Sequence, residues 1–487
     1  MTTALATAAN PNPASFSVLI PLFAVGVALV LGWAWWVRSI NLALGLASTV
    51  AMWTLAYVAL LQPGFLAGEL LFAGMVLCLV LGGARAARLR AAAQPGSPAT
   101  HAHGLRVGLV SATVNLMVLG MFLRPEQGNT ATQAALYASG LFAGSAILGW
   151  VGDIIGQRMR PAARTTDPSV LMAAVLAANI LVMVVLGGLV TSLESGLAVP
   201  DWPNSFGHNM LLYPLSAMKG GIFYEHAHRL FGMLVGVTTL CTWMVVIKDQ
   251  KRMLPRALAS LMVVLVITQG WLGGLSVTGN VTTSMNPADL APNVKIRIAH
   301  AMLGQSVFAL GMVLAFAVTQ RWATAVPLQV PGARSARALP VWALACLIVQ
   351  LFLGACVRLL QKPPTGETGA SIPSWALHGH ITMALIVATV AILAGLRCSR
   401  VSQLPWLQRT GKAVMHTVGL QMALGIGALV VVLVRRGTEI PWWEYSLTTA
   451  HQATGALLLG LTAALAAQAL RFVAPAPQGV TAPAAQA

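Results

Sequence analysis

Charged residues are scarce in this sequence. Asp, Glu, Lys and Arg together make up 8% of its 487 residues, whereas hydrophobic residues make up 57%. A soluble protein of this length cannot bury so much apolar surface, so a soluble globular fold is excluded. The apolar residues form long runs, and about 20 of them in a helix cross a bilayer. The composition therefore predicts an all-α polytopic membrane protein. We expect thirteen spans, at residues 16–37, 40–61, 66–83, 106–123, 133–155, 169–190, 222–247, 257–277, 296–320, 339–359, 375–396, 411–434 and 447–471.

Acidic residues are rarer than basic residues in this sequence. There are 12 Asp and Glu against 29 Lys and Arg, which gives a net charge of +17. The basic residues lie in short loops between apolar runs, as the positive-inside bias produces. We therefore expect contact with membrane lipid headgroups and none with nucleic acid. The basic loops fall on one side of the predicted topology, which places the C-terminus in the cytoplasm; they are 84–90, 157–164, 248–256, 321–337 and 397–412.

Cysteines are also few. The five cysteines show no CxxC or other metal-ligand spacing, and no disulfide framework is indicated. The N-terminal segment lacks the positive region of a signal peptide. We therefore expect membrane insertion to depend on the spans themselves.

Four spans each carry one histidine about a turn inside the same end. His228 and His300 are 72 residues apart, and His380 and His451 are 71 apart. The predicted topology places all four at the outer level of the membrane. Imidazole inside a membrane is costly unless it has a partner. We interpret the two pairs as two buried haem sites, each with an axial pair of histidines from two helices.

The sequence also contains a repeat. The segment QGWLG at 269–273 matches QMALG at 421–425 with an offset of 152 residues, and the histidine pairs match with offsets of 152 and 151. Two four-helix transmembrane bundles in parallel orientation, together an eight-helix core, are therefore predicted. About five further helices precede them and carry no motif that we can interpret. The predicted domains are an N-terminal multi-span region at 1–165, the first repeat at 166–325, the second repeat at 335–473 and a disordered tail at 474–487.

One acid and one base accompany the first histidine only. Glu225 lies three residues before His228 and four before Arg229, so the three share one helix surface. Glu225 is a candidate catalytic residue that relays protons or stabilises a cationic intermediate, and Arg229 is a candidate haem-binding residue. A simple ion pair at the helix start is an equally good interpretation. The second repeat has Leu377 and Ile381 at these positions, which favours one reactive and one supporting centre.

The remaining histidines are weaker candidates. His226 and His378 each lie two residues before a predicted ligand and so point to another helix face, although His378 is kept as an alternative to His380. His101 and His103 are expected in a solvated loop. The outer loop 191–221 has two interpretations of equal weight, an ordered cap over the first-half site or an ordinary interfacial loop.

These motifs together resemble the haem A synthase family. The resemblance rests on Glu225-xx-His228-Arg229, on the Gln-xx-Leu-Gly helices and on the loop sequence ESGLAVPDWP, and it covers about residues 169–471. It implies a duplicated eight-helix bundle in the bacterial plasma membrane, with its haem sites on the extracytoplasmic side. The implied activity is oxidation of a ring methyl of haem O to the formyl group of haem A, which terminal oxidases use.

The resemblance also assigns the residues. His228 and His300 would hold the substrate haem, with Glu225 essential for turnover, and His380 and His451 would hold a haem b cofactor. The expected partners are haem O and membrane lipid, with the haem O-forming prenyltransferase, oxidase assembly factors and a second copy of the chain as candidate protein partners.

The sequence departs from the family in one respect. Many bacterial members carry a cysteine pair in the first outer loop, whereas residues 191–221 contain no cysteine, so no role of that pair is carried over. Two other classes of function stay open. A di-haem b-type cytochrome that transfers electrons would explain the four histidines but not the one-sided Glu225. A non-catalytic haem carrier would bind haem and form no oxidation product.

Overall fold

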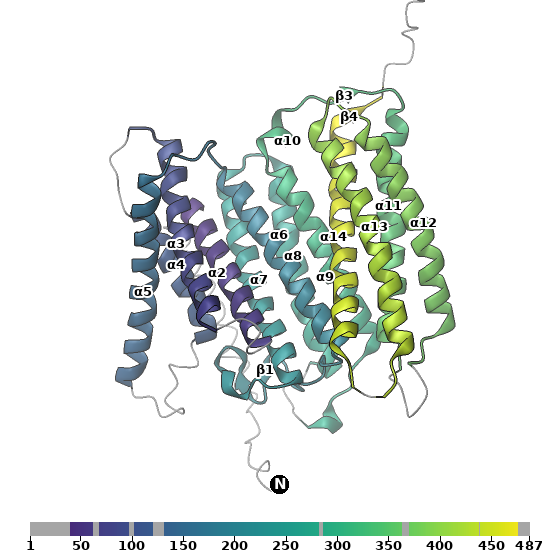
Figure 1. Ribbon diagram of the computed structural model, residues 1–487, viewed down its shortest axis with the longest axis horizontal. Coiled ribbons are helices and arrows are strands. Elements are labelled where there is room, and N and C mark those ends of the chain that lie inside the picture. The colour runs from purple at the N-terminus through teal and green to yellow at the C-terminus, as the bar shows by residue number, and fades with distance from the viewer. Residues whose placement is uncertain are drawn as a thin grey trace, which may run out of the picture. The chain divides into compact units, whose positions relative to one another are not determined.

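The computed structural model describes residues 39–61, 68–96, 102–119, 131–281, 286–362, 370–437 and 439–475. Within these residues the chain forms thirteen α-helices, with a few 3-10 turns and two-residue strands between them (Figure 1). Eleven of these helices are long and apolar enough to cross a membrane. The prediction of an all-α polytopic membrane protein is therefore confirmed.

Eight long helices coincide with the eight spans predicted for the duplicated core. They are α6 (Pro168–Ser192), α7 (Gly221–Asp249), α8 (Met253–Thr278), α9 (Val294–Ala317), α11 (Ala333–Leu359), α12 (Ser374–Ser399), α13 (Pro405–Val434) and α14 (Trp442–Phe472). Short elements join them: β1 (Asn204–Ser205), β2 (His208–Asn209), α10 (Gln320–Thr324), β3 (Leu328–Gln329) and β4 (Val473–Ala474). β1 pairs with β2 in antiparallel orientation, and β3 pairs with β4 in parallel orientation.

Four helices precede this core in the described part of the chain. They are α2 (Ser39–Leu61), α3 (Gly68–Ala93), α4 (Ala102–Leu119) and α5 (Ala131–Arg158). Three of the five predicted N-terminal spans correspond to α2, α3 and α5, which all qualify as candidate spans. The predicted span 16–37 lies outside the described residues. The span predicted at 106–123 overlaps α4, which is not among the eleven candidates.

One sequence prediction in this region is wrong. His103 does not lie in a solvated loop, because α4 begins at Ala102, four residues before the predicted span. Its ring is buried, and Nδ1 lies 3.2 Å from Oδ1 of Asn41 in α2. This contact gives the buried imidazole a polar partner inside the bundle. His101 lies outside the described residues.

Local chemistry sets the helix ends. At the start of α6, Oδ1 of Asp167 accepts a hydrogen bond of 2.8 Å from the backbone N–H of Ser169, and Pro168 occupies the first turn. This is the preferred arrangement of an N-cap followed by proline. At the end of α8, Gly279 adopts a left-handed conformation with φ 76°, which terminates the helix at low steric cost.

The chain divides into two compact units, unit 1 (Met1–His300) and unit 2 (Ala301–Ala487). In unit 1 the N-terminal helices pack through small residues. A Cβ on Gly149 of α5 would meet the carbonyl oxygen of Gly104 in α4, and a Cβ on Gly83 of α3 would meet that of Gly149. Such close backbone approach is the usual basis of helix association in membranes, where apolar side chains gain little by leaving lipid.

The N-terminal helices also contact the core helix α7. Trp53 and Tyr57 of α2 lie against α7, with ring centroids 5.5 Å from Phe231 and 5.2 Å from Phe223, respectively. Nε1 of Trp53 donates a hydrogen bond of 2.9 Å to Oδ1 of Asn115 in α4, which fixes the indole. Within unit 1, α2 therefore braces the helix that carries Glu225 and His228.

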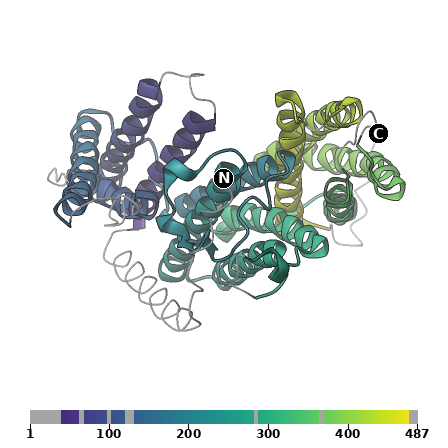
Figure 2. The same cartoon turned by 90° about the horizontal axis from the view of Figure 1, so that it is seen from below.

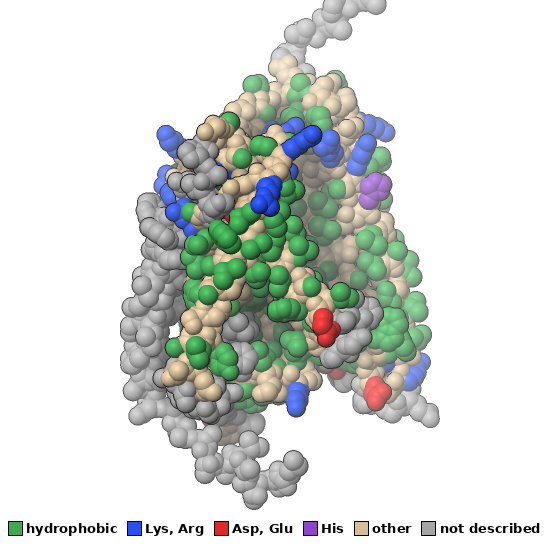
Figure 3. All heavy atoms as spheres, turned by 60° about the vertical axis from the view of Figure 1, so that its left-hand side comes forward, with side chains coloured by type: hydrophobic (Ala, Val, Ile, Leu, Met, Phe, Trp, Pro, Cys, Tyr) green, Lys and Arg blue, Asp and Glu red, His purple; other side chains and the backbone are tan. Residues whose placement is uncertain are grey.

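Unit 2 is a bundle in which α11, α12, α13 and α14 pack in sequence and α14 returns to α11 (Figure 2). Its core includes Leu407, Val414 and Leu465, which are fully buried. The last turns of α9 join this unit, where Phe308 lies against Gly460 of α14. Several helices expose large apolar side chains at the surface of the protein. Figure 3 shows one such face, on which Lys and Arg gather toward one end.

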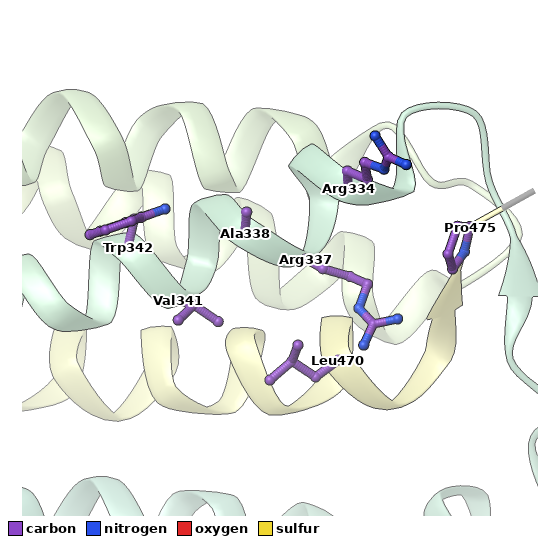
Figure 4. Close-up of a pocket in the computed structure, with 7 residues that line it drawn as sticks. All are labelled: Arg334, Arg337, Ala338, Val341, Trp342, Leu470 and Pro475. Atoms are coloured by element: carbon purple, nitrogen blue, oxygen red, sulfur yellow. The ribbon is translucent and has the colours of Figure 1, made fainter.

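A shallow groove lies in unit 2 between the start of α11 and the end of α14 (Figure 4). Val341 and Leu470 form its apolar floor, with Trp342 at one end and Arg334 and Arg337 at the other. The groove is at the end of the bundle opposite to the first turns of α12 and α14. It is therefore separate from the histidines described below.

The glycine packing makes a testable prediction. Gly149→Ala should destabilise unit 1 by about 1–3 kcal/mol, because the new methyl forces α4 and α5 apart. The matched control is Gly140→Ala in the same helix, where a Cβ meets nothing within 4 Å. The control should be neutral or slightly stabilising, since alanine favours a helix by about 1 kcal/mol. Thermal unfolding in detergent measures both variants, and equal midpoints would refute the close packing.

Candidate functional site: two histidine pairs and a fastened loop

The four predicted histidines lie in the second or third turn of four core helices. In unit 1, α7 carries His228 and α9 carries His300; in unit 2, α12 carries His380 and α14 carries His451. Within each unit the two histidine-bearing helices begin at the same end of the bundle (Figure 1). All four side chains are half-buried. The structure thus gives each unit one pair of imidazoles at one level.

Each imidazole packs against a glycine of the preceding long helix. A Cβ on this glycine would come within 2.9–3.0 Å of the ring carbon Cε1, so only glycine fits without displacing the ring. The pairs are Gly187 of α6 with His228, Gly273 of α8 with His300, Gly354 of α11 with His380, and Gly425 of α13 with His451. The backbone of one helix therefore fixes the position of the imidazole on the next.

A glutamine accompanies three of the four histidines. It lies one turn before the glycine, and its Nε2 approaches Nε2 of the imidazole. The distances are 3.5 Å from Gln269 to His300, 3.3 Å from Gln350 to His380, and 3.4 Å from Gln421 to His451. Oε1 of all three glutamines is buried without a hydrogen-bond partner. Buried polar atoms of this kind need an explanation, and a missing polar ligand is one.

The histidine pair of unit 2 has the geometry of two axial ligands. The ring centroids of His380 and His451 lie 6.3 Å apart with an interplanar angle of 80°. Two imidazole nitrogens that bind one metal ion at roughly 2 Å each place their ring centres about 6 Å apart. No group of three or more His, Cys, Asp or Glu able to hold a metal ion occurs among the described residues. The side chains present therefore fit a haem iron with two axial histidines better than a protein-only metal site.

The histidine pair of unit 1 differs in its polar contacts. His228 and His300 lie close enough to interact electrostatically. Nδ1 of His300 lies 3.1 Å from the carbonyl oxygen of Gln269, which is the usual way to fix the tautomer of a ligating imidazole. Nδ1 of His228 is buried without a hydrogen-bond partner. The two members of this pair are therefore held differently.

Glu225 and Arg229 form a buried ion pair on α7. Oε1 of Glu225 accepts a bond of 2.6 Å from Nη2 of Arg229, and the side chains are 5% and 9% exposed. Oε2 of Glu225 accepts a bond of 2.8 Å from the N–H of Val199 in the loop that follows α6. Arg229 also donates to the carbonyl oxygens of Val199, Asp201 and Asn204. The ion pair therefore ties this loop to the helix that carries His228.

The loop itself is ordered around Asp201. This carboxylate is fully buried and accepts bonds of 2.7 and 2.8 Å from the N–H groups of Phe206 and Gly207. Trp202 lies against Gly274 of α8, where no larger residue would fit, and its ring is 5.7 Å from that of Trp271. These contacts favour the interpretation of the loop as an ordered cap, because both α7 and α8 hold it in place.

His226 serves this loop rather than a histidine pair. Its buried ring accepts or donates a bond of 3.1 Å with Oγ of Ser205 and lies 4.8 Å from the ring of Tyr213. Burial, and secondarily the negative charge of Asp201, raises the pKa of the Tyr213 phenol. The phenol therefore stays neutral over the physiological range. His378 is exposed, whereas the neighbouring His380 contacts both Gln350 and His451.

Sequence reasoning missed several of these groups. The facing glycines and the amides of the glutamines were visible only as Gln-xxx-Gly repeats, with no indication that they meet the histidines. A buried ion pair was also missed: Nε of Arg435, after α13, lies 3.4 Å from Oε2 of Glu444 in the first turn of α14. Both side chains are 2% exposed. This pair joins the two helices close to His451, and no sequence signal pointed to it.

Comparison with known proteins agrees with this arrangement. Residues 170–463 match the family model COX15-CtaA, described as cytochrome oxidase assembly protein. The chain is 29% identical over 343 residues to the heme A synthase of Caulobacter sp. strain K31, which covers 60% of this chain and 93% of that protein. It is 26% identical over 352 residues to the heme A synthase of Rhizorhabdus wittichii, covering 62% and 94%.

A third relative is similar over the same region. The chain is 27% identical over 345 residues to the heme A synthase of Beijerinckia indica, which covers 59% of this chain and 89% of that protein. The matched segment contains all four histidines, the ion pair and the loop between α6 and α7. On this match, the chain belongs to the COX15-CtaA family of cytochrome oxidase assembly proteins, the haem A synthase family.

Proposed function

We propose that this protein is a haem A synthase, which oxidises the ring methyl of haem O to the formyl group of haem A. The observation that carries the proposal is the asymmetry between two otherwise equivalent histidine pairs. Both have imidazoles packed on glycine, but only the first has an acid one helical turn from a histidine, Glu225, and a loop that is hydrogen-bonded to that acid. An enzyme with one reactive haem and one supporting haem requires such a difference. The relatives named heme A synthase support the same activity.

The two pairs receive different haems in this proposal. His228 and His300 hold the substrate haem O, and His380 and His451 hold a haem b cofactor. When bound, the cofactor haem supplies one-electron redox chemistry. The chain's own contribution is to fix four imidazoles against glycine backbones and to close the first pair under a loop. That closure shields the site from bulk solvent.

Glu225 is the catalytic residue in this proposal. The formyl oxygen comes from water or dioxygen. When it comes from water, the hydrogens that are removed leave as protons and their electrons pass to an electron acceptor, so a group must carry protons away from the site. The buried carboxylate of Glu225 lies one helical turn from His228 and is held by Arg229 and by the N–H of Val199. Arg229 positions this carboxylate and adds positive charge beside the haem site. The Glu225–Arg229 ion pair is thus part of the mechanism as well as of the loop anchor.

The proposed function also implies a cellular location and a set of partners. The protein resides in the bacterial plasma membrane, with both haem sites toward the extracytoplasmic side and the C-terminus in the cytoplasm. Haem O reaches it from the prenyltransferase that makes haem O, and haem A leaves toward the oxidase. Helix α2 braces α7 through Trp53 and Tyr57. Oxidase assembly factors and a second copy of the chain are further candidate partners.

The proposed role of Glu225 leads to a clear expectation. Glu225→Ala and Glu225→Gln should retain both haems but lower the formation of haem A by about 100-fold or more, since proton transfer by a positioned side chain contributes that much. Glu194→Gln, which alters an exposed carboxylate in the same loop, should retain activity. The haems are extracted and quantified by chromatography after expression with a haem O source. An active Glu225→Gln variant would remove the carboxylate from the mechanism.

The second pair makes an independent prediction. His380→Ala should lose the haem b cofactor, because one of its two axial ligands is removed, and His378→Ala should keep it. Haem b per chain, measured in purified protein from its extracted pigment, distinguishes the two variants. If His380→Ala keeps its haem and His378→Ala loses it, the ligand is His378 instead.

A further inference from the structure

The end of unit 2 that lies opposite to its histidine pair carries positive charge only. The segments 320–341, 397–412 and 466–475 form this end, and they contain no Asp or Glu. Their basic residues are Arg321, Arg334, Arg337, Arg397, Arg400, Arg409, Lys412 and Arg471. In the part of the chain that the structure describes, none of these residues forms an ion pair. The counter-charge is therefore expected to come from outside the chain.

Arg334 and Arg337 differ from the basic residues that the fold itself uses. Three arginines stabilise the end of the bundle by packing on an aromatic ring or by donating to a neighbouring segment, namely Arg321, Arg397 and Arg471. Arg334 is exposed, and its side chain makes no hydrogen bond with the described residues. Arg337 makes one weak contact, of 3.5 Å, from Nη1 to the carbonyl oxygen of Val473. Both lie in the first two turns of α11, where the helix dipole does not compensate a positive charge.

These two arginines lie at one end of the groove between α11 and α14 (Figure 4). Beyond them the groove is apolar, with the exposed side chains of Val341 and Leu470 as its floor and Trp342 at its other end. Trp342 follows Arg334 by eight residues in one helix, so the groove runs roughly 12 Å along the helix axis. Its charged end is at the end of the bundle, and its apolar end points toward the middle of the spanning helices.

We propose that this groove binds one anionic phospholipid. The phosphate of the headgroup lies between Arg334 and Arg337, which donate charge-assisted hydrogen bonds to it. An acyl chain lies on Val341 and Leu470 and runs toward Trp342. A phospholipid in one leaflet has this order of groups, with charge at the membrane surface and apolar carbon toward the centre.

The charge and the shape of the groove favour this ligand over related ones. A zwitterionic lipid would bring a second positive group into a region that has no acidic residue. A soluble anion would bind the arginines but would leave the apolar floor uncovered. An anionic lipid satisfies both parts of the groove, because it supplies the counter-charge and covers the exposed apolar side chains.

A lipid in this position would join the first and the last helix of the bundle α11–α14. Helix α14 carries His451, and α11 carries Gly354, which contacts His380. The lipid would therefore stabilise the helices that hold the second histidine pair. The inference does not depend on the proposed function; in the topology proposed above, the groove faces the cytoplasmic leaflet.

The test uses the full-length protein, purified in detergent and freed of lipid. Native mass spectrometry counts the lipids bound per chain during titration with phosphatidylglycerol, and with phosphatidylcholine that has the same acyl chains. Glycerophosphoglycerol, the headgroup without acyl chains, is added as a competitor. The variant Arg334→Gln/Arg337→Gln removes two charges from the groove. The matched control, Arg400→Gln/Arg409→Gln, removes two exposed charges at the same end of the bundle but outside the groove.

The expected results separate a site from a general attraction of charges. The wild type should bind one phosphatidylglycerol about tenfold or more tightly than phosphatidylcholine, and this binding should raise the midpoint of thermal unfolding. The groove variant should bind phosphatidylglycerol about tenfold or more weakly, because two basic contacts with the lipid are lost. The control variant should change the affinity by less than about threefold. The headgroup alone should not compete, because it lacks the apolar part.

Three outcomes would overturn the inference. Equal affinity for the two lipids would show that the groove does not select an anion, and an equal loss in the groove variant and its control would show a general attraction. Competition by glycerophosphoglycerol would identify a site for a soluble anion instead. If the double variant does not fold, Arg334→Gln decides, since this side chain makes no hydrogen bond with the described residues; an unchanged affinity in that variant would also contradict the proposal.

Discussion

The burial of imidazole among apolar helices is the constraint on which this structure depends. Within a membrane a polar ring cannot remain unsatisfied at low cost, and the chain accommodates four such rings in a similar way, although Nδ1 of His228 and of His451 is left without a protein partner. A glycine on one helix admits the ring of the next, and in three cases a glutamine one turn away contacts it. Each such contact requires a glycine of one helix and a histidine of the next long helix to lie at one level.

The histidine–glycine contact is repeated in both pairs, but the polar groups around the two pairs differ. The second pair has a glutamine amide beside each imidazole, and the Arg435–Glu444 ion pair holds the residue after α13 to the first turn of α14. The first pair has such an amide beside only one imidazole, and a buried carboxylate and an ordered loop beside it. In the proposed function, two similar histidine pairs become a reactive substrate-haem site and a supporting cofactor-haem site through a small number of local differences.

Much of this arrangement follows from the sequence. The apolar runs predicted the eight core helices, and the histidine spacing predicted the pairs that the structure brings together, because both depend on periodicity along one chain. The sequence did not reveal which helix each imidazole packs against, since that depends on contacts between helices. It also left the interpretations of Glu225 open: the structure contains the ion pair with Arg229 and also ties it to Val199 of the loop. His103 was misplaced because the helix extends beyond its apolar part.

The most direct test of the account is the identity of the haems in the wild-type protein. Haem is extracted from protein purified after expression with a haem O source, separated by chromatography and identified by mass. The account predicts haem A, or its hydroxylated precursor, together with haem B in the same preparation. Haem B alone, at two per chain although haem O is available, would contradict it and identify a di-haem cytochrome that transfers electrons.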